Sequence, residues 1–99
     1  MGPNSGVTAA PNRSEIKAKV MQKEQSETFP DKWHLDLEIL ESRNLHGGNF
    51  ARVGERVKGF TFGDLKYIPQ ESIIRAQAEF LGDARSGQLQ LSDVAIIER

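Results

Sequence analysis

The feature that most constrains the fold is an alternation of apolar and polar residues with a period of two. It is clearest from Trp33 to Leu40, where Trp33, Leu35, Leu37 and Ile39 share one parity. The other parity is mostly polar. Because successive side chains of a β-strand point to opposite faces, this pattern predicts a strand with one buried face. His34 then lies on the outward face, and Trp33 is expected to be buried.

The same period recurs elsewhere and predicts an all-β chain. A first strand is expected around Ile16, Ala18 and Val20, a third from Val53 to Phe62, a fourth from Ser72 to Leu81 and a fifth from Gln88 to Glu98. In the fourth strand, the inward residues are Ile74, Ala76, Ala78 and Phe80. The connections are rich in turn-forming residues, with a loop at residues 42–51 and a hairpin connection at residues 82–87.

The remaining segments set the domain boundaries. Residues 1–13 are small and turn-favouring with no apolar period, so they are expected to be a disordered tail or a cloning remnant. Residues 14–99 then form the one domain that 99 residues allow. Between Gly63 and Glu71, Asp64 is a candidate cap and Pro69 a candidate end for a short helical turn. Five closely spaced strands with this helical turn favour a small closed or nearly closed barrel.

Composition narrows the classes of function. With 13 basic and 14 acidic side chains the net charge is -1, so any affinity for a polyanion must come from a local patch. There is no cysteine, which excludes disulfides and thiolate zinc sites and makes a cytoplasmic setting the default. No apolar run approaches the roughly 20 residues that span a bilayer, so no membrane partner is expected.

The end of the chain resembles a known family. The segment Ser72-Ile73-Ile74-Arg75-Ala76-Gln77-Ala78-Glu79-Phe80, followed by residues 82–87 and Gln88-Leu89-Gln90-Leu91, resembles the closing hairpin of single-stranded-DNA-binding barrels. With the order of elements, residues 14–98 resemble the oligonucleotide/oligosaccharide-binding (OB) fold, a five-stranded Greek-key barrel. The resemblance implies a ligand on the outer face of the second and third strands, between the loops that join strands one to two and four to five.

These positions supply a candidate nucleic-acid interface. Cations that meet phosphates and rings on which bases stack are the two ingredients of single-strand binding. The candidate residues are Phe29, Lys32, Arg52, Arg56, Lys58, Phe60, Arg75 and Arg85.

The third strand allows two interpretations. Read literally, Val57 and Gly59 face the core, while Phe60 and Phe62 stand outside beside Arg56 and Lys58. Exposing two rings forfeits roughly 1.5–3 kcal/mol each. We favour the alternative, in which Gly59 marks a β-bulge that flips the phase and makes both phenylalanines core residues.

Acidic residues oppose the nucleic-acid hypothesis. Asp36, Glu38 and Glu41 lie on or beside the same outer face and would repel phosphates, unless they pair across the sheet with Lys58, Arg56 or Lys19. His34 and His46 lie in different elements without carboxylates at ligand spacing, so no metal is expected. No phosphate loop, nucleophile elbow or thiol is present, and we expect neither an enzyme nor a cofactor.

Two hypotheses follow. The first is a non-catalytic module that binds single-stranded nucleic acid with little sequence preference and with an affinity that falls steeply with salt. The second is a protein-interaction or self-association module, in which Phe29, Phe50 and Tyr67 serve as aromatic anchors.

Overall fold

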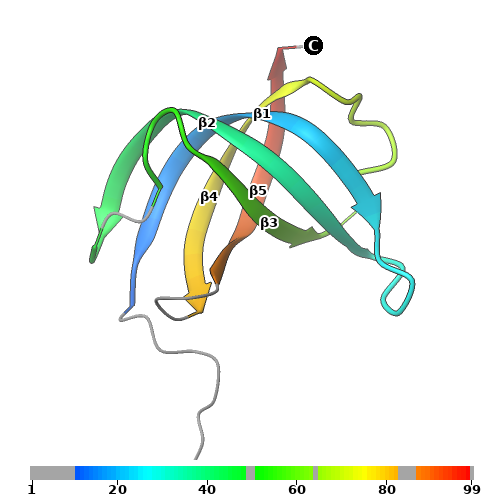
Figure 1. The fold of residues 1–99 in the computed structure, drawn as a ribbon, viewed down its shortest axis with the longest axis horizontal. Coiled ribbons are helices and arrows are strands. Elements are labelled where there is room, and N and C mark those ends of the chain that lie inside the picture. The colour runs from blue at the N-terminus through cyan, green and yellow to red at the C-terminus, as the bar shows by residue number, and fades with distance from the viewer. Residues whose placement is uncertain (1–10, 49–50, 64, 83–86, 99) are drawn as a thin grey trace, which may run out of the picture.

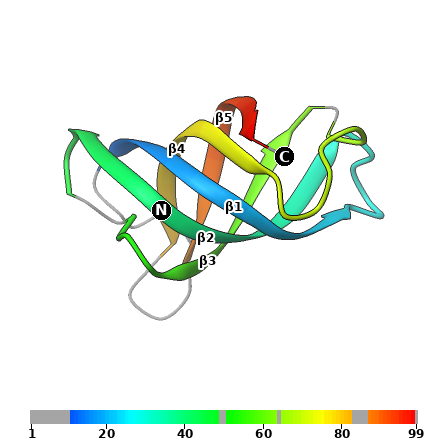
Figure 2. The same ribbon diagram turned by 90° about the horizontal axis from the view of Figure 1, so that it is seen from above.

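The five expected strands form a closed β-barrel (Figure 1), and the alternating apolar residues of the first, second and fourth strands face its interior. The computed structural model describes residues 11–48, 51–63, 65–82 and 87–98. Its strands are β1 (Arg13–Gln25), β2 (Lys32–His46), β3 (Arg56–Phe62), β4 (Ile73–Gly82) and β5 (Gly87–Glu98). Their order around the barrel is β1-β2-β3-β5-β4, and β4 pairs with β1 to close it. Figure 2 shows the strands enclosing the interior from a second direction.

The pairing is antiparallel throughout except between β3 and β5. That parallel ladder contains only the pairs Gly59 with Leu89, Phe60 with Gln90, and Thr61 with Leu91. In contrast, β1 and β2 pair along nearly their whole length. The barrel therefore depends for its closure on one short contact.

The core confirms the inward faces expected for β1, β2 and β4. The four alternating residues of β2, including Trp33, are buried against Ile16, Ala18 and Val20 of β1. From the other half of the barrel come Ile74, Ala76, Ala78, Leu89 and Leu91. Burial of apolar side chains stabilises a fold by about 25 cal/mol per Å² removed from water, so this shared interior is the main stabilising term.

Several strand boundaries differ from those expected, and β3 begins at Arg56, three residues after the expected start at Val53. β2 continues to His46 through residues 42–46, where the sequence predicted a loop, because these residues pair with the start of β1. β1 itself begins at Arg13, and the preceding residue, Asn12, is buried. Its Nδ2 donates to the carbonyl of Phe80, and its Oδ1 accepts from the Phe80 N–H. The barrel thus begins at Asn12, while residues 1–10 lie outside the described residues.

The predicted bulge at Gly59 is wrong. The β2–β3 register runs without a shift from Lys32 opposite Phe62 to Glu38 opposite Arg56. Gly59 serves a different purpose: a Cβ placed there would lie 3.0 Å from the carbonyl oxygen of Leu89 and 3.2 Å from Cδ1 of Leu37. Glycine therefore lets β5 approach β3 closely enough to close the barrel.

The helical turn expected between β3 and β4 is absent from the described part of that connection. Residues 65–72 form two consecutive turns, in which Ile68 N–H donates to Leu65 and Ser72 N–H to Pro69. Leu65 and Ile68 are buried against the barrel core, and Lys23 Nζ donates to the carbonyls of Leu65 and Lys66. This connection therefore covers one end of the barrel. No helix that could cross a membrane is found among the described residues.

We expect Gly59→Val to destabilise the protein by about 1–3 kcal/mol, the usual cost of overpacking a filled site. The added side chain must displace Leu37 or the backbone of β5. Urea denaturation measures the effect. Arg56→Val is the matched control, since it places the same side chain on an exposed position of β3 and should change stability by less than about 0.5 kcal/mol. Equal stability of the two variants would contradict the role given to Gly59.

Candidate functional site

The ladder registers arrange the outward side chains of three strands in rows. Each row contains one residue from β3, one from β2 and, in most rows, one from β1. From the β1–β2 loop end, the rows are Phe62–Lys32, Phe60–His34–Glu24, Lys58–Asp36–Gln22 and Arg56–Glu38–Lys19. Aromatic rings therefore gather at the loop end of this face, and ionised side chains follow along it.

Lys32, Phe60 and Phe62 form what we call the aromatic–lysine cluster. The two rings meet edge to face with their centroids 6.0 Å apart. Lys32 Nζ lies 4.6 Å from the Phe60 centroid and 5.9 Å from that of Phe62, both within range of a cation–π interaction. Phe62 is 52% exposed, whereas Phe60 is 7% exposed although it lies on the outer face and outside the core cluster. Phe60 is thus the buried member of the cluster, and Phe62 is the member whose ring is open to solvent.

The β1–β2 loop lies at the same end of the barrel. Ser26 Oγ accepts hydrogen bonds from the N–H groups of Thr28 and Phe29, and Lys32 N–H donates to the Phe29 carbonyl. Gly63 N–H donates to the Asp31 carbonyl over 2.7 Å, which ties the loop to the residue after Phe62. Phe29 is 54% exposed on this loop. A second exposed ring is therefore held at the cluster's end of the barrel.

The cations expected on this face have different surroundings. Lys58 Nζ forms an ion pair with Asp36 at 3.1 Å, and Arg56 lies opposite Glu38. Arg52 is exposed in the turn before β3, where its carbonyl accepts a hydrogen bond from Glu55 N–H. Arg85 lies outside the described residues. The cross-strand pairing expected for Asp36 and Lys58 is confirmed.

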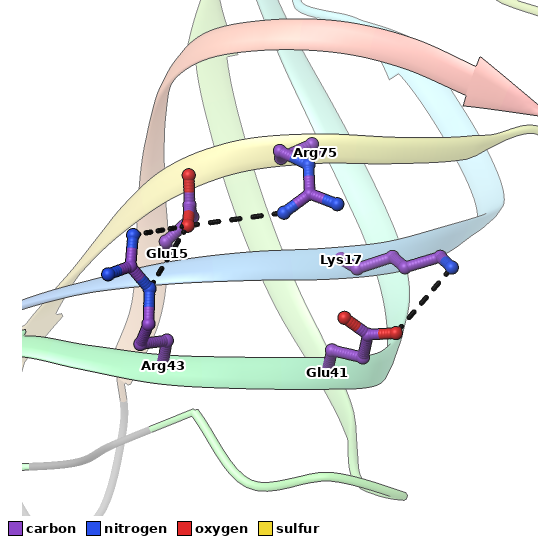
Figure 3. Close-up of polar contacts among 5 residues, drawn as sticks. All are labelled: Glu15, Lys17, Glu41, Arg43 and Arg75. Atoms are coloured by element: carbon purple, nitrogen blue, oxygen red, sulfur yellow. Dashed lines mark hydrogen bonds and ion pairs between the residues drawn. The ribbon is translucent and has the colours of Figure 1, made fainter.

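Arg75 belongs to another part of the surface. It projects from β4, where β4 pairs with β1, and its Nη1 lies 4.0 Å from Oε1 of Glu15 (Figure 3). Glu41 forms an ion pair with Lys17 at 3.6 Å. Lys17 was not among the partners expected for it, which included Lys19. The structure thus separates Arg75 from the cations of β3.

Glu15 is the centre of this second group of charges. Arg43 donates to Glu15 Oε1 from Nη2 at 2.7 Å and from Nε at 3.3 Å. These hydrogen bonds are the largest cause of a lowered pKa of Glu15, and the charges of Arg43 and Arg75 act in the same direction while desolvation opposes them. The group is therefore a set of paired charges and offers little to an incoming anion.

A shallow groove of about 420 Å³ crosses the outer face beyond the aromatic–lysine cluster. The outward side chains along it are Gln22, Glu24, His34, Asp36, Lys58 and Gln88. Lys23 also lines the groove, so two lysines face two carboxylates there. Both ammonium groups are engaged, Lys58 by Asp36 and Lys23 by the carbonyls of Leu65 and Lys66, which makes the groove a poor site for phosphate. No group of three or more metal-ligating side chains occurs in the described ranges.

The structure therefore brings together part of the predicted interface. Lys32 and Phe60 lie in the cluster, Phe29 is at the same end of the barrel, and Arg56 and Lys58 follow along β3. Sequence reasoning missed Phe62 as a surface residue because it favoured the bulge. The literal parity of β3, which places Phe62 beside Lys58 and Arg56, was the signal that identified it.

We expect the Glu15 pKa, measured by NMR titration of its carboxyl carbon, to lie below that of an ordinary glutamate. A carboxyl whose pKa is lower in the folded state stabilises the fold above its unfolded pKa, and this contribution is lost as pH falls through the folded pKa. Glu15→Gln should therefore destabilise the protein at neutral pH and progressively less in acid.

Arg43→Gln should raise the Glu15 pKa toward its ordinary value more than Arg75→Gln does, because among the described residues Arg43 alone donates hydrogen bonds to this carboxylate. A midpoint that responds equally to both substitutions would contradict the assigned order of causes.

No protein-family model matches the sequence, and neither the curated proteins nor the solved structures gave a significant match. The function of this barrel must therefore be inferred from its own residues.

Proposed function

We propose that this chain is a non-catalytic module that binds single-stranded nucleic acid with little sequence preference along the strand. The binding surface is the outer face of β2 and β3, entered at the end that carries Phe29 and the aromatic–lysine cluster. The observation that carries the proposal is the half-exposed Phe62 ring beside the Lys32 ammonium group.

The chemistry of the cluster fits a nucleotide. A base can stack on the open face of a phenyl ring, whatever its identity, and this is worth about 1–3 kcal/mol per base in single-strand binders. Lys32 is placed beside the ring, where the phosphate of a stacked nucleotide would meet a cation. Phe29 offers a second ring at the same end of the barrel.

The architecture also supports the proposal. The chain folds into a five-stranded closed barrel of β-strands, which is consistent with the OB-like fold that its sequence resembles. OB folds bind ligands on the face of their second and third strands and between the adjoining loops. The cluster and Phe29 lie in the corresponding places of this chain, on β2, β3 and the β1–β2 loop.

Electrostatics limit how much of the affinity the phosphates can supply. Lys58 is paired with Asp36, and Arg56 and Lys19 flank Glu38. Stacking must therefore contribute more than charge. With about two or three phosphates neutralised, a single-strand slope of about -0.7 per phosphate gives roughly a tenfold loss of affinity for a fourfold rise in salt.

We expect Phe62→Ala and Phe29→Ala each to weaken binding of a short labelled oligothymidylate by about 5-fold or more, from the loss of stacking. Fluorescence anisotropy at low salt measures the change. Leu45→Ala is the control, because it removes an exposed apolar side chain from the opposite end of β2 and should leave the affinity unchanged.

Two results would overturn the proposal. One is an absence of binding by the unmodified chain at low salt. The other is an affinity that Phe62→Ala and Leu45→Ala reduce to the same extent, since that would locate the strand away from the cluster.

A second candidate function, an interface with a protein or with another copy of the chain, is favoured by exposed apolar side chains away from the cluster. Tyr67 is 79% exposed and Val53 is 65% exposed, whereas Phe50 lies outside the described residues. If these residues form an interface between copies, sedimentation velocity should show a salt-insensitive dimer that Tyr67→Ala weakens. If the protein sediments as a monomer at all accessible concentrations, the hypothesis of self-association is wrong.

A further inference from the structure

A cleft opens where β3 and β5 separate. Their parallel ladder ends at Thr61 and Leu91, after which β3 ends while β5 continues beside β4 to Glu98. The space between them has a volume of about 370 Å³. Its walls include Phe62 and Leu65 on one side and Gln90, Ser92 and Asp93 on the other. The cleft therefore adjoins the exposed ring to which we assign stacking.

A β-bulge in β5 accounts for this separation. Gln77 of β4 pairs with Ser92, and Arg75 pairs with Ala95, so two residues of β5 lie opposite Ala76 alone. Asp93, the first of the two, has a φ of 53°. A bulge bends its strand and increases the local twist, which carries β5 away from β3. Aspartate tolerates the left-handed region better than most residues, but a non-glycine residue held there is still strained, and such strain gathers at functional sites.

The walls of the cleft differ in chemistry. Leu65 and Leu91 are buried and apolar, and Phe62 is half-exposed. Asp93 is exposed, and no hydrogen bond or ion pair of its side chain occurs among the described residues. The carboxylate is an acceptor with two oxygens, each able to take a hydrogen bond. An aromatic ring and a pair of acceptors therefore line one small space.

We propose that this cleft takes one base of the bound strand and favours guanine at that position. This inference rests on the proposed function. Guanine presents two neighbouring N–H donors on its Watson–Crick edge, N1–H and the N2 amino group, which a carboxylate can accept together. On that edge adenine and cytosine place an acceptor beside their amino donor, and thymine has a single N–H between two carbonyls. With any of these three bases, one carboxylate oxygen of Asp93 would lie opposite another acceptor instead of a donor.

The experiment compares oligothymidylates of about ten nucleotides that carry one central deoxyguanosine, deoxyadenosine or deoxycytidine. A single guanine avoids four-stranded assemblies. We expect the guanine strand to bind at least about 5-fold more tightly than the others, the lower range for a bidentate contact with a base. Amide shifts of residues 90–94 should move more with the guanine strand than with the others.

Asp93→Asn is the decisive variant. Asparagine also tolerates a positive φ, so the bulge is retained, but one acceptor is replaced by a donor. The guanine preference should disappear while binding of plain oligothymidylate persists. Asp31→Asn is the matched control: it removes the same charge from the loop tied to Gly63, outside the cleft, and should keep the preference.

The outcomes separate the two proposals. Equal binding of the guanine, adenine and cytosine strands and of plain oligothymidylate would overturn the guanine inference and leave the proposed function intact. A guanine preference that survives Asp93→Asn would overturn the assignment to this cleft. Failure of every strand to bind would overturn the proposed function itself.

Discussion

The short parallel contact between β3 and β5 is the constraint on which the rest of the barrel depends. Every other pair of neighbouring strands is antiparallel and has a longer ladder, whereas this one has three residue pairs. Gly59 makes it possible by leaving room for the backbone at Leu89. Closure in turn removes the open sheet edges that strands of this length would otherwise present to other chains.

The same contact shapes both proposed binding features. Because β3 keeps a regular register up to Phe62, both phenylalanines point to the outer side of the barrel, where Phe62 is half-exposed and Phe60 is buried beside Lys32 and Phe62. Because the ladder with β5 stops at Leu91, space remains beside Phe62 for a ligand. A longer ladder would fill this space with paired backbone. The shortness of the closure is thus a structural requirement for the site.

Part of this arrangement was predictable from the residues alone. Trp33, Leu35, Leu37 and Ile39 alternate strictly, so their burial and the all-β class follow from the pattern. The end of β2 was not predictable, because residues 42–46 are mostly exposed and carry no apolar period. Gly59 was ambiguous, since glycine suits a bulge as well as a close approach, and only the position of Leu89 distinguishes them.

The sequence also could not predict which strands lie next to each other in the barrel. Arg75 and Lys58 are both outward cations. They lie on different parts of the surface, which becomes clear only when the order of the strands around the barrel is known. The cleft at Asp93 depends on a bulge, and no feature of the residues around Asp93 indicated one before the register with β4 was known. Local sequence patterns thus predicted which side chains of a strand face the core. Which residues come together in the site could be known only from the pairing of the strands.

The antiparallel pairing of β1 with β2 places the beginning of β1 beside His46 and its end beside Trp33. Around the other side of the barrel, Asn12 is hydrogen-bonded to Phe80, Phe80 pairs with Leu89, and Leu89 pairs with Gly59 of β3. Only β4 and β5 therefore lie between Asn12 and the strand that carries Phe60 and Phe62. A fluorophore attached ahead of Asn12 is thus close enough to the proposed ligand to report its arrival, whereas a bulky carrier fused there would crowd the binding face.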